Sequence, residues 1–155
     1  MTGILFICHG NICRSPMAQC VMTQLVRERG LAAFYRIGSA AVSDEEEGHG
    51  IYPPARAELR RHGIPAPEHR AHRLTREEAA QWELLIAMDE WNLRLLRSLL
   101  GPEADARTHL LMEYTGRGGE VDDPWYTRRF DRAYEDILEG CTALLDALEA
   151  ARTGA

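Results

Sequence analysis

Short apolar runs alternate along this chain with segments whose apolar residues recur at helical spacing, which predicts strands and helices in turn. The predicted strands cover residues 3–8, 35–40, 84–88 and 109–113, and the predicted helices cover residues 17–29, 54–62, 75–78 onward, 89–100 and 128–150. Strands that alternate with helices indicate a parallel sheet covered on both faces. The sequence therefore predicts an α/β fold, a doubly wound sheet of about four parallel strands, within a single domain of residues 1–155.

Several residues mark the ends of the predicted helices. Ser15 can cap the first helix, Pro16 suits the first helical position, and Gly30 suits the left-handed position after the last turn. Residues 75–78, Thr-Arg-Glu-Glu, have the spacing of a capping box and open a short helix. The strand–helix boundary at residues 8–16 is therefore the sharpest in the sequence.

Residues 8–16, Cys-His-Gly-Asn-Ile-Cys-Arg-Ser-Pro, follow the first predicted strand, and ligands of such sheets bind beyond the carboxyl ends of the strands. The N-terminus of the following helix favours anions. Gly10 and Asn11 tolerate a left-handed backbone, so the loop can turn its amides inward, and Arg14 supplies a charged fork that matches two phosphate oxygens. We expect a phosphate-binding loop formed by His9, Gly10, Asn11, Ile12, Cys13 and Arg14.

Cys8 lies where the strand meets this loop. A lone cysteine at the end of a buried strand is usually a small core residue. Here the Cys-x5-Arg spacing brackets a loop long enough to wrap a tetrahedral anion, and a helix N-terminus with an arginine favours the thiolate form. We therefore interpret Cys8 as a nucleophile directed at a bound phosphoryl group.

The charge and cysteine content narrow the function classes. The net charge is −6 without a block of Lys or Arg, which argues against nucleic acid or an anionic membrane as partner. No apolar run approaches the ~18 residues of a membrane span, and the N-terminus does not resemble a signal peptide. We expect a cytoplasmic location with the four cysteines as free thiols. The histidines show no ligand spacing, so no metal and no cofactor is expected.

The loop resembles the signature of the low-molecular-weight protein tyrosine phosphatases, Cys-x-Gly-Asn-Ile-Cys-Arg-Ser-Pro. Further similarity covers nearly the whole chain and includes residues 38–40, 61–64, 88–90, 92–93 and the Asp-Pro-Trp-Tyr segment 123–126. The resemblance implies a phosphotyrosine-protein phosphatase that needs no cofactor and forms a cysteinyl-phosphate intermediate. Its catalytic residues would be Cys8, Arg14 and Asp123.

The resemblance also implies supporting roles. Asp123 would be the general acid and then the base, and its neighbour Asp122 an exposed residue. Ser15 would donate a hydrogen bond to the Cys8 sulfur, and Cys13 would pair reversibly with Cys8 under oxidation. A polar network that holds the loop would contain Asn11, Ser39 and His69.

Specificity follows from the expected cleft walls. Trp125 and Tyr126 would flank an aromatic ring, and a deep cleft favours phosphotyrosine because phosphoserine is too short. Relatives that act on phosphoarginine tend to carry threonine at the position of Ile12, so Ile12 favours tyrosine. Residues 45–47, three glutamates, are expected to form a solvated loop.

Three alternatives remain. A protein-arginine phosphatase is the main one. An arsenate reductase is disfavoured, because no cysteine lies between Cys20 and Cys141. A non-catalytic phosphotyrosine-binding module would lack Cys8, Arg14 or the acid. The expected partner is a phosphotyrosine-containing protein, with a bacterial tyrosine kinase as a candidate, and the expected product is inorganic phosphate.

Overall fold

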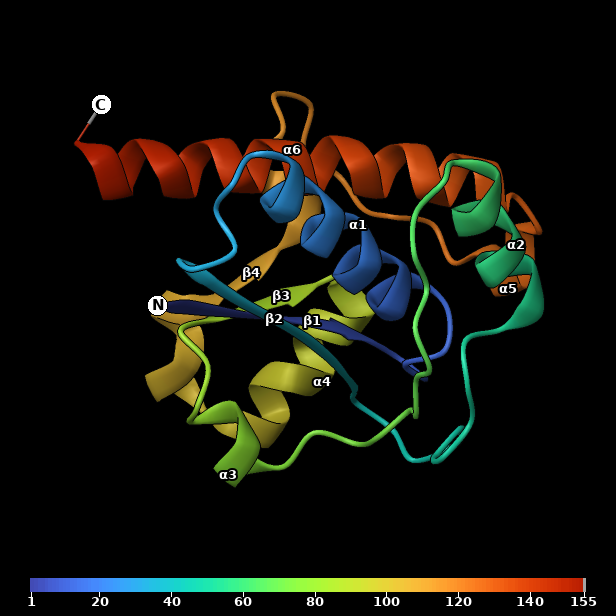
Figure 1. The fold of residues 1–155 in the computed structure, drawn as a ribbon. Coiled ribbons are helices and arrows are strands. Elements are labelled where there is room, and N and C mark those ends of the chain that lie inside the picture. The colour runs from blue at the N-terminus through green and yellow to red at the C-terminus, as the bar shows by residue number, and fades with distance from the viewer. Residues whose placement is uncertain (155) are drawn as a thin grey trace.

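The computed structural model describes residues 1–154, whose centre is a parallel sheet of four strands in the order β2-β1-β3-β4 (Figure 1). The strands are β1 Thr2–Cys8, β2 Tyr35–Ala41, β3 Leu84–Ala87 and β4 Thr108–Leu110. The apolar run of β1 suits its central place, because β2 and β3 flank it and six of its seven residues are buried. The predicted doubly wound α/β fold is confirmed.

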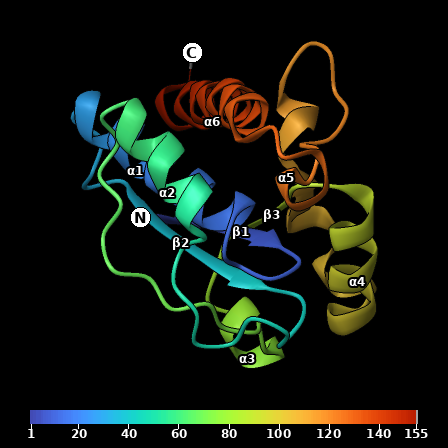
Figure 2. The ribbon, with the colours of Figure 1, turned by 90° about the vertical axis from the view of Figure 1, so that its right-hand side faces the viewer.

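Helices cover both faces of the sheet (Figures 1 and 2). The α-helices are α1 Arg14–Glu28, α2 Pro53–Arg61, α3 Arg76–Ala79, α4 Glu90–Leu100, α5 Pro124–Thr127 and α6 Phe130–Thr153, and short 3-10 helices cover Pro102–Arg107 and Leu111–Tyr114. On one face α1, α2 and α6 pack together, and α3 and α4 lie on the other. None of the helices within residues 1–154 is long and apolar enough to cross a membrane.

Side chains of β1 alternate between the two faces, as the period of a strand requires. Ile4 and Phe6 belong to the core beneath α1 and α6, while Leu5 and Ile7 belong to the core against α4. Continuing the alternation, Cys8 lies with the α1 core. The buried strand therefore delivers the thiol to the carboxyl edge of the sheet, on the side where α1 begins.

The start of α1 differs from the prediction. The helix begins at Arg14, and its cap residue Cys13 makes no side-chain capping bond, so the predicted cap by Ser15 is wrong. The reason is that Ser15 turns its hydroxyl toward Cys8 and Asn11 inside the loop. The helix end is as predicted, with Gly30 at φ 69°.

The capping box at α3 is only half formed. Thr75 Oγ1 accepts a hydrogen bond of 3.1 Å from the Glu78 amide, as predicted. The Glu78 carboxylate instead bonds His72 Nε2 at 2.8 Å. The side chain of His72, three residues before Thr75, has thus replaced the backbone amide of Thr75 as the partner of Glu78.

The C-terminal third contains two further differences. The predicted strand at residues 109–113 is shorter, because β4 ends at Leu110 and a 3-10 helix follows. In that 3-10 helix Leu111 packs against α6 at Gly140, where a Cβ would lie 2.5 Å from Leu111 Cγ. The predicted helix at residues 128–150 corresponds to α6, which begins two residues later because Arg128 adopts a left-handed backbone, φ 60°, and the short helix α5 before it was not predicted.

Candidate active site

A cavity of about 260 Å³ lies over the loop between β1 and α1. It is lined by Cys8, His9, Gly10, Ile12, Cys13, Arg14, Glu45, Glu46, Asp123, Trp125 and Tyr126. The structure therefore brings residues from two distant segments, 45–46 and 123–126, around the predicted phosphate loop. Asn11 is the exception among the predicted loop residues, because it is fully buried beneath the cavity floor.

Two groups of Ser15 contact the buried Cys8 sulfur. Ser15 Oγ lies 3.0 Å from Cys8 Sγ, and the Ser15 amide donates to the same sulfur at 3.4 Å. Asn11 Nδ2 donates to Ser15 Oγ at 2.7 Å, which leaves the hydroxyl proton of Ser15 free for the sulfur. Both contacts stabilise negative charge on sulfur.

The loop backbone is held at Asn11, whose φ of 59° is uncommon for a residue with a side chain. His69 Nε2 lies 2.7 Å from the Asn11 carbonyl oxygen, and the His72 amide donates to Asn11 Oδ1 at 3.3 Å. Burial lowers the pKa of His69, so the ring is neutral and its Nε2–H donates to the carbonyl. These contacts keep the loop curled around the cavity.

The structure does not bring Ser39 into this network. Its hydroxyl donates to Gln19 Oε1 at 2.6 Å, on α1. Ser39 lies on β2, and the expected contact with the loop is replaced by one that ties β2 to α1.

Arg14 is buried and held by two acidic side chains and one carbonyl. Its Nη1 donates to Asp89 Oδ2 at 2.7 Å and to the Val121 carbonyl at 2.8 Å, and its Nη2 lies 3.5 Å from Asp123 Oδ2. Burial opposes the charge, but Cys8, Asp123 and Asp89 outweigh it and raise the pKa of Arg14. An acidic protein thus places a permanent cation at the centre of an anion-binding loop.

Asp89 is a site residue that the sequence reasoning missed. It follows β3 at the carboxyl edge of the sheet and caps α4, since its Oδ1 accepts from the Asn92 amide at 2.7 Å. A polar residue immediately after a buried central strand was the available signal. The carboxylate that begins α4 therefore also orients Arg14.

We expect Asp89→Asn to lower kcat/KM for p-nitrophenyl phosphate by about 10–100-fold, because Arg14 loses the carboxylate that sets its orientation. Asparagine still caps α4, so the melting temperature should change little. Steady-state kinetics and thermal unfolding check this result. Unchanged kinetics with a lowered melting temperature would restrict Asp89 to a structural role.

Asp123 enters the cavity from the start of α5. Its Oδ1 accepts from the Trp125 amide at 3.0 Å, and its Oδ2 faces Arg14. Asp122 beside it is exposed. Trp125 packs against Tyr52 with ring centroids 5.1 Å apart, and Tyr126 is 81% exposed. The Asp-Pro-Trp-Tyr segment therefore supplies both a carboxylate at the cavity and an aromatic wall.

The glutamates at residues 45–47 lie in a largely exposed loop, as expected, and each makes a polar contact. Glu45 Oε2 lies 3.1 Å from His9 Nε2, and Glu46 Oε2 lies 2.7 Å from His49 Nδ1. Glu47 accepts from the backbone amide of residue 73 at 2.9 Å. Glu45 and Glu46 thus line the cavity together with the aromatic residues Trp125 and Tyr126.

The four cysteines are unpaired and buried. Burial, Cys8 and Asp123 raise the pKa of the Cys13 thiol well above its ordinary value, so Cys13 is a neutral thiol beside the cavity. Within residues 1–154, no group of three or more histidine, cysteine or acidic side chains is arranged to hold a metal ion.

Fold and site together define an α/β protein with a buried thiol in an anion-binding loop. A family model described as low molecular weight phosphotyrosine protein phosphatase matches residues 3–153. A Bacillus subtilis relative, low molecular weight protein-tyrosine-phosphatase YfkJ, is 31% identical over 96% of this chain and 97% of its own. Low molecular weight protein-tyrosine phosphatase A of Mycobacterium tuberculosis is 38% identical over 94% of this chain and 88% of its own.

Solved structures agree with this match. The crystal structure of Bacillus subtilis YfkJ superimposes with a TM-score of 0.94 at 31% identity, over 97% of this chain and 96% of that one. A Drosophila arginine phosphatase has a TM-score of 0.87 at 29% identity, over 96% and 98% of the two chains. The chain belongs to the low molecular weight phosphotyrosine protein phosphatase family.

Proposed function

We propose that residues 1–155 act as one phosphatase domain that hydrolyses phosphotyrosine in proteins and releases inorganic phosphate. Cys8 is the nucleophile, Arg14 and the loop amides bind the phosphoryl group, and Asp123 is the general acid and base. The observation that carries this proposal is the meeting of Cys8, Arg14 and Asp123 around one cavity. Membership of the family supports it.

In the first step the phosphoryl group lies in the loop with Arg14 across two of its oxygens. The Cys8 thiolate attacks phosphorus in line, and the bond to the tyrosyl oxygen breaks. Asp123 gives its proton to that oxygen, so the products are the dephosphorylated tyrosine side chain of the substrate protein and cysteinyl-phosphate. Ser15 supports the sulfur through its hydroxyl and amide.

In the second step water attacks the cysteinyl-phosphate. The Asp123 carboxylate takes a proton from this water, the S–P bond breaks, and Cys8 leaves as a thiolate that Ser15 stabilises. Inorganic phosphate departs, and Asp123 is again protonated. Arg14 and the loop amides stabilise the charge on phosphorus in both steps, which is usually the larger catalytic contribution.

The walls of the cavity support phosphotyrosine as the substrate. Ile12 and Trp125 line it, which gives a planar ring apolar surface to pack against. Phosphoarginine is the second candidate, because the Drosophila arginine phosphatase shares the fold at 29% identity. Ile12 favours tyrosine over arginine.

An assay of the wild-type protein tests this function. We expect hydrolysis of p-nitrophenyl phosphate at mildly acidic pH, insensitive to EDTA, with phosphotyrosine peptides turned over faster than phosphoserine or phosphoarginine peptides. Faster turnover of phosphoarginine would make the chain an arginine phosphatase, and arsenate reduction would make it a reductase. A folded protein without turnover would be a phosphotyrosine-binding module.

We also propose that Cys13 protects the nucleophile. Hydrogen peroxide would oxidise Cys8 to a sulfenic acid and be reduced to water, and the Cys13 sulfur would then form a disulfide with Cys8 and release a second water. The shared cavity of the two thiols supports this chemistry. After peroxide and then dithiothreitol, we expect wild type to regain activity and Cys13→Ser to regain much less. Equal recovery would remove this role from Cys13.

The cellular setting that we propose is the cytoplasm, supported by four unpaired cysteines. A tyrosine kinase of the same cell that autophosphorylates is a candidate partner, because its phosphotyrosines are substrates of the required chemistry. Incubating such a phosphorylated kinase with wild type and with Cys8→Ser would test this, since only wild type should remove its phosphotyrosine.

A further inference from the structure

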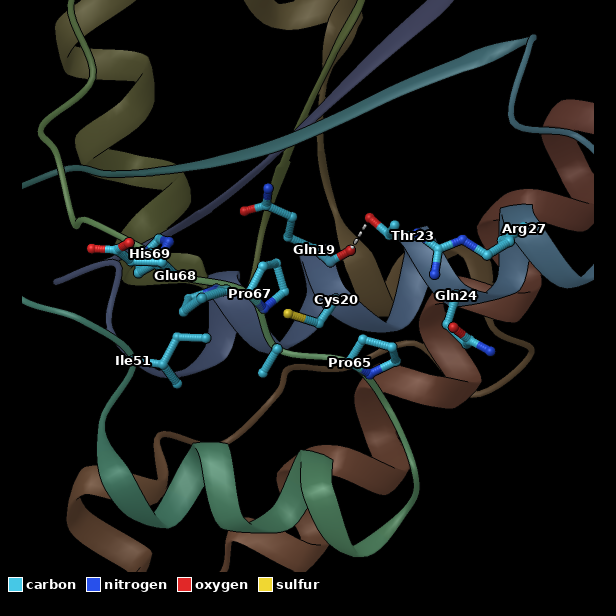
Figure 3. A pocket seen from close by; sticks show the side chains of 12 residues that line it. Gln19, Cys20, Thr23, Gln24, Arg27, Ile51, Pro65, Pro67, Glu68 and His69 are labelled. Atoms are coloured by element: carbon cyan, nitrogen blue, oxygen red, sulfur yellow. Dashed lines mark hydrogen bonds between the residues drawn. The ribbon is translucent and has the colours of Figure 1, made fainter.

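A second cavity, of about 420 Å³, lies outside the proposed active site, between α1 and residues 65–69 (Figure 3). One face of α1, which carries Pro16, Gln19, Cys20, Thr23, Gln24 and Arg27, forms one wall. Residues 65–69, Pro-Ala-Pro-Glu-His, cross over it, and Ile51 closes one end. The volume is within the usual range of about 300–1,000 Å³ for small-molecule sites.

The lining is apolar in its middle. Figure 3 shows the Cys20 sulfur directed into the space between α1 and the prolines of residues 65–67. Burial raises the pKa of Cys20 to about 11, so this thiol is a neutral packing surface. With Ile51 and the two prolines it offers the kind of surface that a flat aromatic ring contacts well.

The charged groups lie at opposite ends. Figure 3 places Glu68 beside His69 at one end and Arg27 at the other, with the Arg27 side chain extending toward Thr23 and Gln24. The neighbouring Arg29 pairs with Asp146 at 2.7 Å, whereas Arg27 makes no side-chain ion pair or hydrogen bond within residues 1–154. Arg27 is exposed at the rim of the cavity, where its guanidinium is accessible to pair with a carboxylate.

The cavity is connected to the phosphate loop through His69. This residue lines the cavity and also bonds the carbonyl of Asn11, the loop residue with positive φ. Arg56 Nη1 fixes the same crossing segment by donating to the Ala66 carbonyl at 2.8 Å. Residues 65–69 are thus both the roof of the cavity and the support of the loop.

We propose that this cavity binds a small aromatic carboxylate, which stabilises residues 65–69 in this position and thereby strengthens phosphate binding at the loop. The ligand site itself does not depend on the proposed function, whereas the effect on phosphate binding rests on it. The ring lies against Cys20 and the prolines, and the carboxylate meets Arg27. A filled cavity holds His69 on Asn11, so the loop loses less freedom when phosphate binds.

Because the coupling is reciprocal, it can be measured as a change in the affinity of either ligand. If the carboxylate tightens phosphate binding by some factor, phosphate must tighten carboxylate binding by the same factor. A carboxylate that bound in the phosphate loop itself would behave in the opposite way, because the two anions would compete. The sign of the effect therefore separates the second cavity from the active site.

The probe is 2-naphthoate, titrated calorimetrically into wild-type protein without phosphate and with saturating inorganic phosphate. We expect its affinity to be about fivefold higher with phosphate. Arg27→Gln should weaken 2-naphthoate about tenfold but leave the uncharged 2-naphthamide unaffected. The matched control, Arg76→Gln on the exposed surface of α3, should bind both probes like wild type. Cys20→Met, which fills the cavity, should weaken both.

The outcomes distinguish three cases: binding in the second cavity with coupling to phosphate, binding there without coupling, and binding in the phosphate loop. Competition between phosphate and 2-naphthoate, or an unchanged affinity in both Arg27→Gln and Cys20→Met, would overturn the binding site. Binding that Arg27→Gln weakens but phosphate does not affect would overturn the coupling. Turnover of p-nitrophenyl phosphate by the same wild-type sample keeps a failure here distinct from a failure of the proposed function.

Discussion

Replacing Cys8 by serine is expected to lower the turnover of p-nitrophenyl phosphate by on the order of 10⁴-fold or more, because the covalent step loses its nucleophile. A serine hydroxyl is un-ionised at neutral pH and lacks the leaving-group ability of a thiolate. Arg14 and the loop amides remain, so the variant should still bind inorganic phosphate. Initial rates and a phosphate titration measure the two properties separately.

The matched control is Cys141→Ser. Cys141 is fully buried in α6, and its Sγ lies 3.8 Å from the Ala18 carbonyl, which a serine hydroxyl can use as its acceptor. We expect its turnover to stay close to that of wild type. Comparable losses in both variants, together with lost phosphate binding, would show a folding effect and remove the nucleophile assignment from Cys8.

Replacing Asp123 by asparagine is expected to slow hydrolysis by on the order of 10²–10⁴-fold for phenyl phosphate and far less for p-nitrophenyl phosphate. A phenolate is a poor leaving group that needs the proton, whereas p-nitrophenolate departs with less help. Asparagine can still accept the Trp125 amide bond that begins α5, so the loop should keep its shape. Paired kinetics with both substrates give the comparison.

Asp122→Asn is the control, because Asp122 is the exposed neighbour. It should leave both rates close to wild type. An equal loss on both substrates in Asp123→Asn would indicate a positioning role instead of proton transfer. A leaving-group-dependent loss in Asp122→Asn would move the acid to that residue.

The fold was predictable because its signals are local. The apolar run of β1, the glycine after α1 and the alternation of strand and helix each depend on residues close in sequence. The same holds for the loop, since Cys8 and Arg14 lie on one short segment. Predictions failed where another partner competed with the expected one, as when His72, six residues from Glu78, took its carboxylate from the capping box.

The short helix α5 and the early end of β4 were not predicted. α5 has four residues and ends at Arg128 with its left-handed backbone, so no helical periodicity marks it. β4 ends where Leu111 packs against Gly140 of α6, a contact between elements far apart in the sequence. Ser39 was misplaced for a related reason, because its partner Gln19 is 20 residues away on another element.

The amino-acid sequence was therefore sufficient for the fold class, for the loop at the end of the first strand, and for the chemical groups on it. Only the tertiary structure decided which groups act on one another. Asp89 contacts Arg14 across 75 residues, because the carboxyl ends of the parallel strands β1 and β3 meet at one edge. The Val121 carbonyl contacts Arg14 across 107 residues, from a segment whose amide bonds Met88 at the end of β3. Local sequence encodes a backbone and its caps, whereas the partners of a buried charge are set by how the layers pack.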